Sequence, residues 1–103
     1  MTKKIKDTLK DLGIMPNIKG YYYLVDAVEL CINEVKNSKS VKSWMWIYTK
    51  VAKIHETTVA RVERCIRSGI EKAITTDLYR KVIRESTNSA FIALVAEYVM
   101  EEM

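Results

Sequence analysis

The sequence predicts an all-α fold, a single domain of six helices that contains a helix-turn-helix. Its 103 residues suit one hydrophobic core, because a core of that size can offset the entropy of ordering the chain. Apolar residues make up 49% of the sequence and recur at helical spacing, without the alternation typical of strands. The chain contains only three glycines and one proline, the residues that most often form turns, and this scarcity favours helices joined by short connections. We therefore expect one domain over residues 1–103.

Two helices are expected in the first part of the chain. In residues 2–13, isoleucine and leucine repeat at helical spacing and a glycine marks the end. A loop over residues 15–20 follows, and residues 23–35 then form a helix that is apolar around much of its circumference. We expect this second helix to lie at the centre of the core. Ser38 and Ser40 are the candidate N-caps of the next helix.

Four more helical segments complete the predicted fold. The third helix covers residues 41–54 and the fourth covers residues 59–73, with the short turn HETT between them. A short segment over residues 77–84 comes next. The cluster ESTNS then caps the last helix, whose apolar side chains span residues 91–100.

Composition and cysteine placement narrow the class of protein. Lys and Arg outnumber Asp and Glu by 17 to 13, a mild preference for anionic partners. Cys31 and Cys65 lie on apolar helix faces outside any CxxC pattern, which favours free buried thiols and a reducing compartment. No apolar run approaches the roughly 18 residues that span a bilayer, and no signal sequence is visible. We expect a cytoplasmic protein that is not embedded in a membrane.

The sequence offers no catalytic constellation. His55 and Glu56 begin like the HExxH motif of zinc peptidases, but Val59 stands where the second histidine is needed. With one histidine in the chain, a structural zinc site also lacks ligands. There is no glycine-rich phosphate loop and no nucleophile beside a base. We expect no enzyme activity, no cofactor, no metal and no small-molecule substrate.

The segment from about Tyr48 to Ala73 has the pattern of a helix-turn-helix. On a wheel with about 100° per residue, residues 57–73 divide into an apolar face and a polar face with three arginines. Small Ala52 and apolar Val62 stand where the two helices of such a motif cross. Ordinary surface charge on an amphipathic helix is the alternative. The spacing in the preceding helix favours DNA binding.

Arg61 and Arg64 stand one turn apart near the start of this helix, and we predict that they read DNA bases. The planar fork of arginine can donate two parallel hydrogen bonds to O6 and N7 of guanine. Glu63 lies between them and can accept a hydrogen bond from N4 of cytosine, which would serve sequence reading. An ion pair between Glu63 and Arg67, four residues apart, is the equally weighted alternative.

Polar side chains around the helix are candidate contacts to the DNA backbone. Thr57 is the expected N-cap, and the start of a helix offers unpaired amides to a phosphate. Thr58, Arg67 and Ser68 are the other candidate backbone contacts. Glu56 occupies the turn, where a left-handed backbone would cause a strain of about 1–3 kcal/mol.

Three stretches, spread over nearly the whole chain, carry a resemblance to a known family. They are IKGYYYLVDAV (residues 18–28), TTVARVERCIRSGIEKA (57–73) and TNSAFIALVAEYV (87–99). Together they resemble the C-terminal DNA-binding effector domain of the sporulation stage-zero master response regulator of endospore-forming bacteria. The resemblance implies transcription regulation in sporulation, with the fourth of six helices in the major groove, reading a box of the type TGTCGAA. It also implies base reading by Arg61, Glu63 and Arg64, with Arg67 nearer the backbone.

The chain departs from the family pattern in places. Ala60 and Ser68 replace a serine and a histidine, so the family's contacts at these two positions do not transfer. The stretch over residues 74–86 is shorter than in the family, which leaves the fifth helix open. No receiver domain is present, so we expect either an excised effector domain or a standalone regulator.

The expected partners are double-stranded DNA and a second copy of the chain. The resemblance implies tandem binding to adjacent boxes, with the last helix near the subunit contact. Leu94, Tyr98 and residues 100–103 form the outer surface of that helix, which is small for an interface that usually buries about 1,200–2,000 Å². We therefore expect pairing only on DNA with two adjacent boxes, where the effective concentration is high.

A helical protein-interaction module is the alternative function. Large aromatic side chains often anchor protein interfaces, and five of them are many for so small a chain. They are Tyr21, Tyr22, Tyr23, Trp44 and Trp46. We favour the interpretation that most of them pack in the core. Salt distinguishes the two functions, because affinity for DNA falls steeply with salt and an aromatic interface depends on it little.

Overall fold

Six helices make up the fold in the computed structural model, which describes residues 1–102. They are α1 (Thr2–Asp11), α2 (Tyr21–Ser38), α3 (Trp44–Ile54), α4 (Val59–Ala73), the π-helical turn η1 (Tyr79–Ile83) and α5 (Asn88–Glu101). The described residues contain no strand, so the predicted all-α fold with six helices is confirmed. None of the helices in residues 1–102 has the length and apolar character that crossing a membrane requires.

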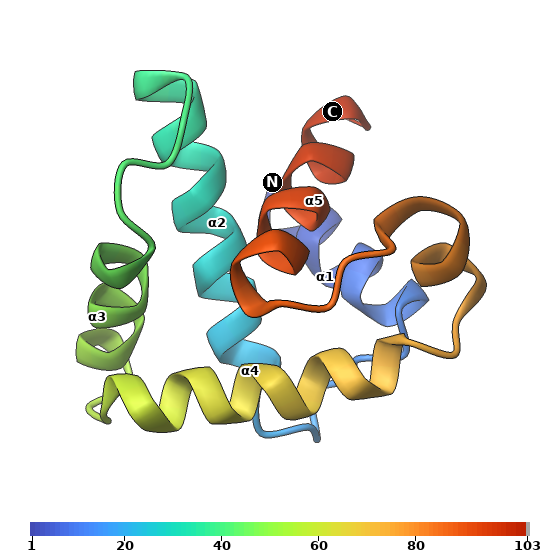
Figure 1. The fold of residues 1–103 in the computed structure, drawn as a ribbon, viewed down its shortest axis with the longest axis horizontal. Helices are drawn as coiled ribbons and strands as arrows, with labels where there is room; N and C mark the ends of the chain where they lie inside the picture. Colours follow the sequence, from blue (N-terminus) through green and yellow to red (C-terminus); the bar gives the residue numbers. More distant parts are fainter. Residues whose placement is uncertain (103) are drawn as a thin grey trace.

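Helix α2 is central, as predicted, since it packs against α1, α3, α4 and α5. In Figure 1, α4 lies across the lower edge of the molecule, and α2, α3 and α5 rise above it. Helix α1 packs against α2 and α5. The start of α1 and the end of α5 lie in the upper half of this view, away from α4.

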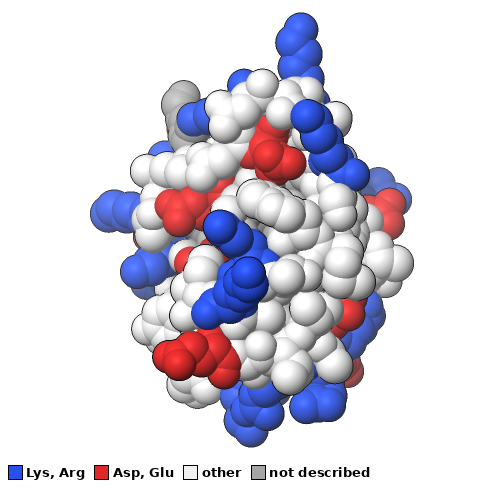
Figure 2. All heavy atoms as spheres, turned by 90° about the vertical axis from the view of Figure 1, so that its left-hand side faces the viewer, with Lys and Arg blue, Asp and Glu red and all other residues white. Residues whose placement is uncertain are grey.

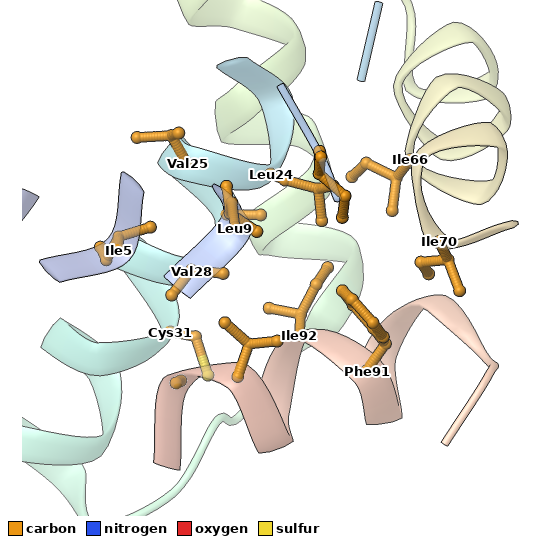
Figure 3. Packing of buried hydrophobic residues seen from close by; sticks show 14 of the residues in the cluster. Ile5, Leu9, Leu24, Val25, Val28, Cys31, Ile66, Ile70, Phe91 and Ile92 are labelled. Carbon is orange, nitrogen blue, oxygen red and sulfur yellow. The ribbon is translucent and has the colours of Figure 1, made fainter. Parts of the chain in front are cut away.

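One cluster of buried apolar side chains joins the helices. Leu9, Leu24, Ile66 and Phe91, from four different helices, are each 0% exposed and converge as Figure 3 shows. Burial of one such side chain contributes about 1.5–3 kcal/mol to folding. Cys31 belongs to this cluster as a free thiol, and burial, assisted by the Glu34 carboxylate, raises its pKa to about 11. The other cysteine is also free and buried, as expected.

The start of α3 differs from the prediction. Ser38 is the last residue of α2 and Ser40 lies in the linker, so neither of these candidates caps α3. Lys39 ends α2 in the left-handed region, with φ of 67°. The chain then becomes extended at Ser43, which is the N-cap: its Oγ accepts a hydrogen bond from the Trp46 N–H at 3.1 Å. The predicted helix over residues 41–54 therefore begins at its fourth residue.

The short segment predicted over residues 77–84 is a π-helical turn. It ends at Arg84, whose φ is 58° and whose N–H donates to the carbonyl of Tyr79 at 2.8 Å. Ile83 is 1% exposed and fixes the turn to the core. Tyr79 stacks on Phe91 of α5, with 6.4 Å between the ring centroids. These contacts bring the end of the turn to the start of α5.

Candidate nucleic-acid interface

Helices α3 and α4 pack together across a four-residue turn, as the two helices of a helix-turn-helix do. The turn follows the Schellman pattern, in which two N–H groups close back on the end of the first helix. The N–H of Thr57 donates to the carbonyl of Ala52 at 2.9 Å, and that of Glu56 donates to Lys53 at 3.2 Å. Glu56 has φ of 52°, so it adopts the left-handed conformation that the sequence analysis considered for this turn.

The N-cap of α4 is Thr58, so the expectation that Thr57 caps this helix was wrong. Thr58 is extended, and its Oγ1 accepts a hydrogen bond from the Arg61 N–H at 3.1 Å. Thr57 cannot take that place because its backbone completes the Schellman turn of α3. The N-cap therefore lies one residue later in the sequence than predicted.

The turn is also tied to α2. Nε2 of His55 and Oδ2 of Asp26 lie 2.5 Å apart, and each side chain is 27% exposed. The ring of Tyr23 meets the imidazole edge-on, with 5.0 Å between the centroids. These contacts hold the entry to α4 against the central helix. The sequence analysis considered His55 only as a metal ligand, rejected that role, and missed this contact because its partner lies 29 residues away.

One face of α4 is fixed to the core. Val62, Ile66 and Ile70 are each 0% exposed, as the wheel predicted. Gly20, at the start of α2, lies directly against the α4 backbone: a Cβ there would stand 2.2 Å from the Cys65 carbonyl oxygen. This close contact requires a glycine at position 20 and lets the backbones of α2 and α4 approach directly.

The opposite face carries the predicted DNA-contacting residues. Arg61, Arg64, Arg67 and Ser68 are exposed, and Glu63 is half-buried on the side toward α5. In Figure 2, which views the α3 side, basic side chains project from the lower edge of the molecule. The structure therefore brings the arginines to one exposed surface and sets the glutamate at its edge.

Glu63 and Arg67 do not form the ion pair that the sequence left open, since no such contact lies within 4.0 Å. The Arg67 guanidinium instead donates to the carbonyl of Ser86, in the segment before α5. The Glu63 carbonyl accepts a hydrogen bond from the Asn88 side chain at 2.9 Å. These two contacts attach α4 to the start of α5, so residues 86–88 support the surface in a way that the sequence did not reveal.

The predicted interface aromatics divide between core and surface. Tyr21 is buried, two others are half-buried, and Tyr22 and Trp46 are 52% and 46% exposed. Among the described residues, no group of three His, Cys, Asp or Glu side chains could hold a metal ion.

Residues 5–99 match the protein family described as the sporulation initiation factor Spo0A C terminal. The chain belongs to this family. Because the match covers nearly the whole chain, the Spo0A C-terminal family confirms the resemblance read from three stretches of sequence. The domain is thus a DNA-binding domain of a transcription regulator of sporulation, and the Spo0A C-terminal family is regulatory and not enzymatic.

Proposed function

We propose that this domain recognises a specific sequence of double-stranded DNA by placing α4 in the major groove. The observation that carries the proposal is the division of α4 into a fully buried face and an exposed face with Arg61 and Arg64. A helix locked to the core presents its exposed side chains in a constant geometry, which reading of base edges requires. The close backbone contact of Gly20 with α4 supports this rigidity.

Arg61 and Arg64 read guanines in this proposal. Both are exposed, lie one turn apart, and have no ion-pair partner within residues 1–102, so their donors are free for bases. Glu63 accepts a hydrogen bond from a cytosine at the edge of the same surface. Its lack of an ion pair with Arg67 supports this role.

The backbone contacts are Thr57, Thr58, Arg67 and Ser68. Thr58 caps α4, and the unpaired amides of the first turn favour a phosphate there. Arg67 and Ser68 are adjacent, exposed residues, about two and a half turns further along α4. The Arg67 side chain keeps donors beyond the one that contacts Ser86, because a guanidinium carries five N–H groups.

Selection of bound duplexes from a random pool tests the reading role. Arg61→Ala and Arg64→Ala should each weaken binding to the selected sequence by about 1–3 kcal/mol and relax preference at particular base pairs. The matched control is Arg80→Ala, which removes an exposed arginine from η1. Equal losses on selected and random duplexes would show that the two arginines hold phosphates and would refute base reading.

Glu63→Gln tests the carboxylate. If Glu63 accepts from cytosine, the variant should change preference at one base pair, because an amide also offers a donor. Removal of simple repulsion between Glu63 and the phosphates would raise affinity for every sequence equally. An even gain of that kind would refute the reading role.

We further propose that two copies bind adjacent sites through α5. Leu94, Tyr98 and Met100 are half-buried on the free copy, and Met103, included in the predicted surface, lies outside the described residues. Sedimentation should find a monomer without DNA, and a two-box duplex should bind cooperatively relative to one box. A tight dimer in free solution, or independent binding to the two boxes, would contradict this proposal.

A further inference from the structure

A groove of about 520 Å³ separates α4 from the loop that joins α1 to α2. In Figure 1 part of this loop is visible below α4, and the two segments line the same groove. The loop and α4 are therefore neighbours on one face. Asn17 and Lys19 line the groove from the loop, and Arg61, Arg64, Ser68 and Lys72 line it from α4.

The loop is held firmly in this position. Two turns tighten it: the N–H of Ile18 donates to Met15 at 3.0 Å, and the N–H of Tyr21 donates to Ile18 at 2.9 Å. Ile18 packs against the core, and Gly20 lies against the Cys65 backbone. Lys19 stands between these two anchored residues, so its backbone has a constant position beside α4.

Every charged residue that lines the groove is positive. Lys19, Lys72, Arg61 and Arg64 all line it, and no acidic residue does. None of the four has an ion-pair partner among residues 1–102. Lys19 and Lys72 add two uncompensated cations to the two arginines that read bases. A concave wall focuses the field of all four charges, so the groove attracts an anion more strongly than a convex surface would. The anion that fits an open groove beside a DNA-reading helix is a sugar-phosphate strand.

We infer that this groove holds the phosphate backbone of one DNA strand, with Lys19 and Asn17 on one side and Lys72 on the other. The α1–α2 loop is then a second DNA-binding element, beside the helix-turn-helix. The inference rests on the proposed function, since it requires α4 to lie in the major groove. Lys19 and Lys72 set how deeply α4 enters, and they contribute affinity without base preference.

Salt-dependent binding to selected and random duplexes tests this inference. Lys19→Ala and Lys72→Ala should each weaken binding about tenfold, the loss of one charge-assisted hydrogen bond, and equally on both duplexes. The slope of log affinity against log salt should fall by about 0.9 for each variant. Lys36→Ala, which removes an exposed lysine from the far end of α2, should change neither quantity.

Phosphate ethylation of the duplex gives a second measurement, which identifies the individual phosphates that each variant no longer contacts. Ethyl groups that block wild-type binding but no longer affect Lys19→Ala mark the phosphate that this lysine contacts. The phosphates identified in the same way with Lys72→Ala should lie next to the Lys19 phosphate, on the same DNA strand. Marks on opposite strands, an effect no larger than that of Lys36→Ala, or a changed base preference would each overturn the inference.

Two outcomes separate this inference from the function on which it rests. Wild-type protein that binds no duplex in a salt-dependent way refutes the proposed function. If the wild-type protein binds a selected duplex and Lys19→Ala and Lys72→Ala bind it equally well, only the role of the groove is refuted. Inorganic phosphate at matched ionic strength should not compete with the duplex, and strong competition would indicate a site for a free anion and overturn the assignment to a strand.

Discussion

Gly20→Ala should displace α4, although the backbone conformation at Gly20 suits any residue, with φ of −80°. The added Cβ would lie 2.2 Å from the Cys65 carbonyl oxygen and 2.8 Å from its carbon. Ordinary contact begins at 3.4 Å, so the two backbones must separate by about 1.2 Å or distort. Because the obstacle is helical backbone and not a side chain, we expect a loss near the upper end of overpacking penalties, about 3 kcal/mol.

Urea unfolding followed by circular dichroism measures this loss, and thermal unfolding should show a midpoint lower by roughly 12–24 °C. Gly69→Ala is the matched control, since its Cβ would meet only the end of the Leu24 side chain, at 3.1 Å. That side chain can turn aside, and alanine favours a helix interior by about 0.8–1.0 kcal/mol over glycine. If Gly20→Ala is as stable as Gly69→Ala, the close approach does not position α4 and our reasoning is wrong.

Three further predictions concern the cap, the crossing and the buried thiol. Thr58→Ala should lower the free energy of unfolding in urea by about 1 kcal/mol, because Thr58 caps α4. Thr57→Ala should lower it by less. Equal losses in the two variants would contradict the assignment of the cap. Val62→Asp should abolish the helical circular dichroism signal, while Val82→Asp, at a site 47% exposed, should keep it. Burial raises the pKa of the Cys31 thiol to about 11. The stability that this protonated thiol contributes is therefore complete below pH 9 and is lost as pH rises toward 11. Cys31→Ala should therefore lose less stability than the wild type over that interval, and equal losses would assign the change to other groups.

Elements with a one-sided apolar pattern could be predicted from the sequence. In α4, burial of Val62, Ile66 and Ile70 matches the wheel, because side-chain spacing alone decides which face is apolar. The capping cluster before α5 was also visible, and Thr87 caps that helix by accepting the Ala90 N–H at 3.4 Å. Local chemistry was sufficient in both cases.

The caps of α3 and α4 could not be predicted to the residue. Ser40 and Ser43 carry the same hydroxyl, and so do Thr57 and Thr58, so side-chain chemistry does not distinguish the members of either pair. The choice follows the backbone, which is left-handed at Lys39 and Glu56 and sets where the next helix begins. Those conformations depend on how the helices pack, and residue type does not reveal them.

Contacts between distant segments account for the remaining differences. The His55–Asp26 contact, the approach of Gly20 to Cys65 and the groove beside Lys19 each join segments that meet only in the folded chain. A lysine in a loop and a glycine before a helix have ordinary roles in any sequence. Their place beside α4 becomes apparent only when α2 is packed against it.

The position of the chain ends has a practical consequence for the measurements above. The start of α1 and the end of α5 lie in the half of the molecule away from α4, and α1 and α5 are neighbours. A fluorophore, an affinity tag or a fused domain placed before α1 would therefore project from the side opposite the groove and the arginines. Anchoring the domain to a sensor surface through that end leaves α4 facing the solution and attaches nothing to the end of α5, where a second copy would bind.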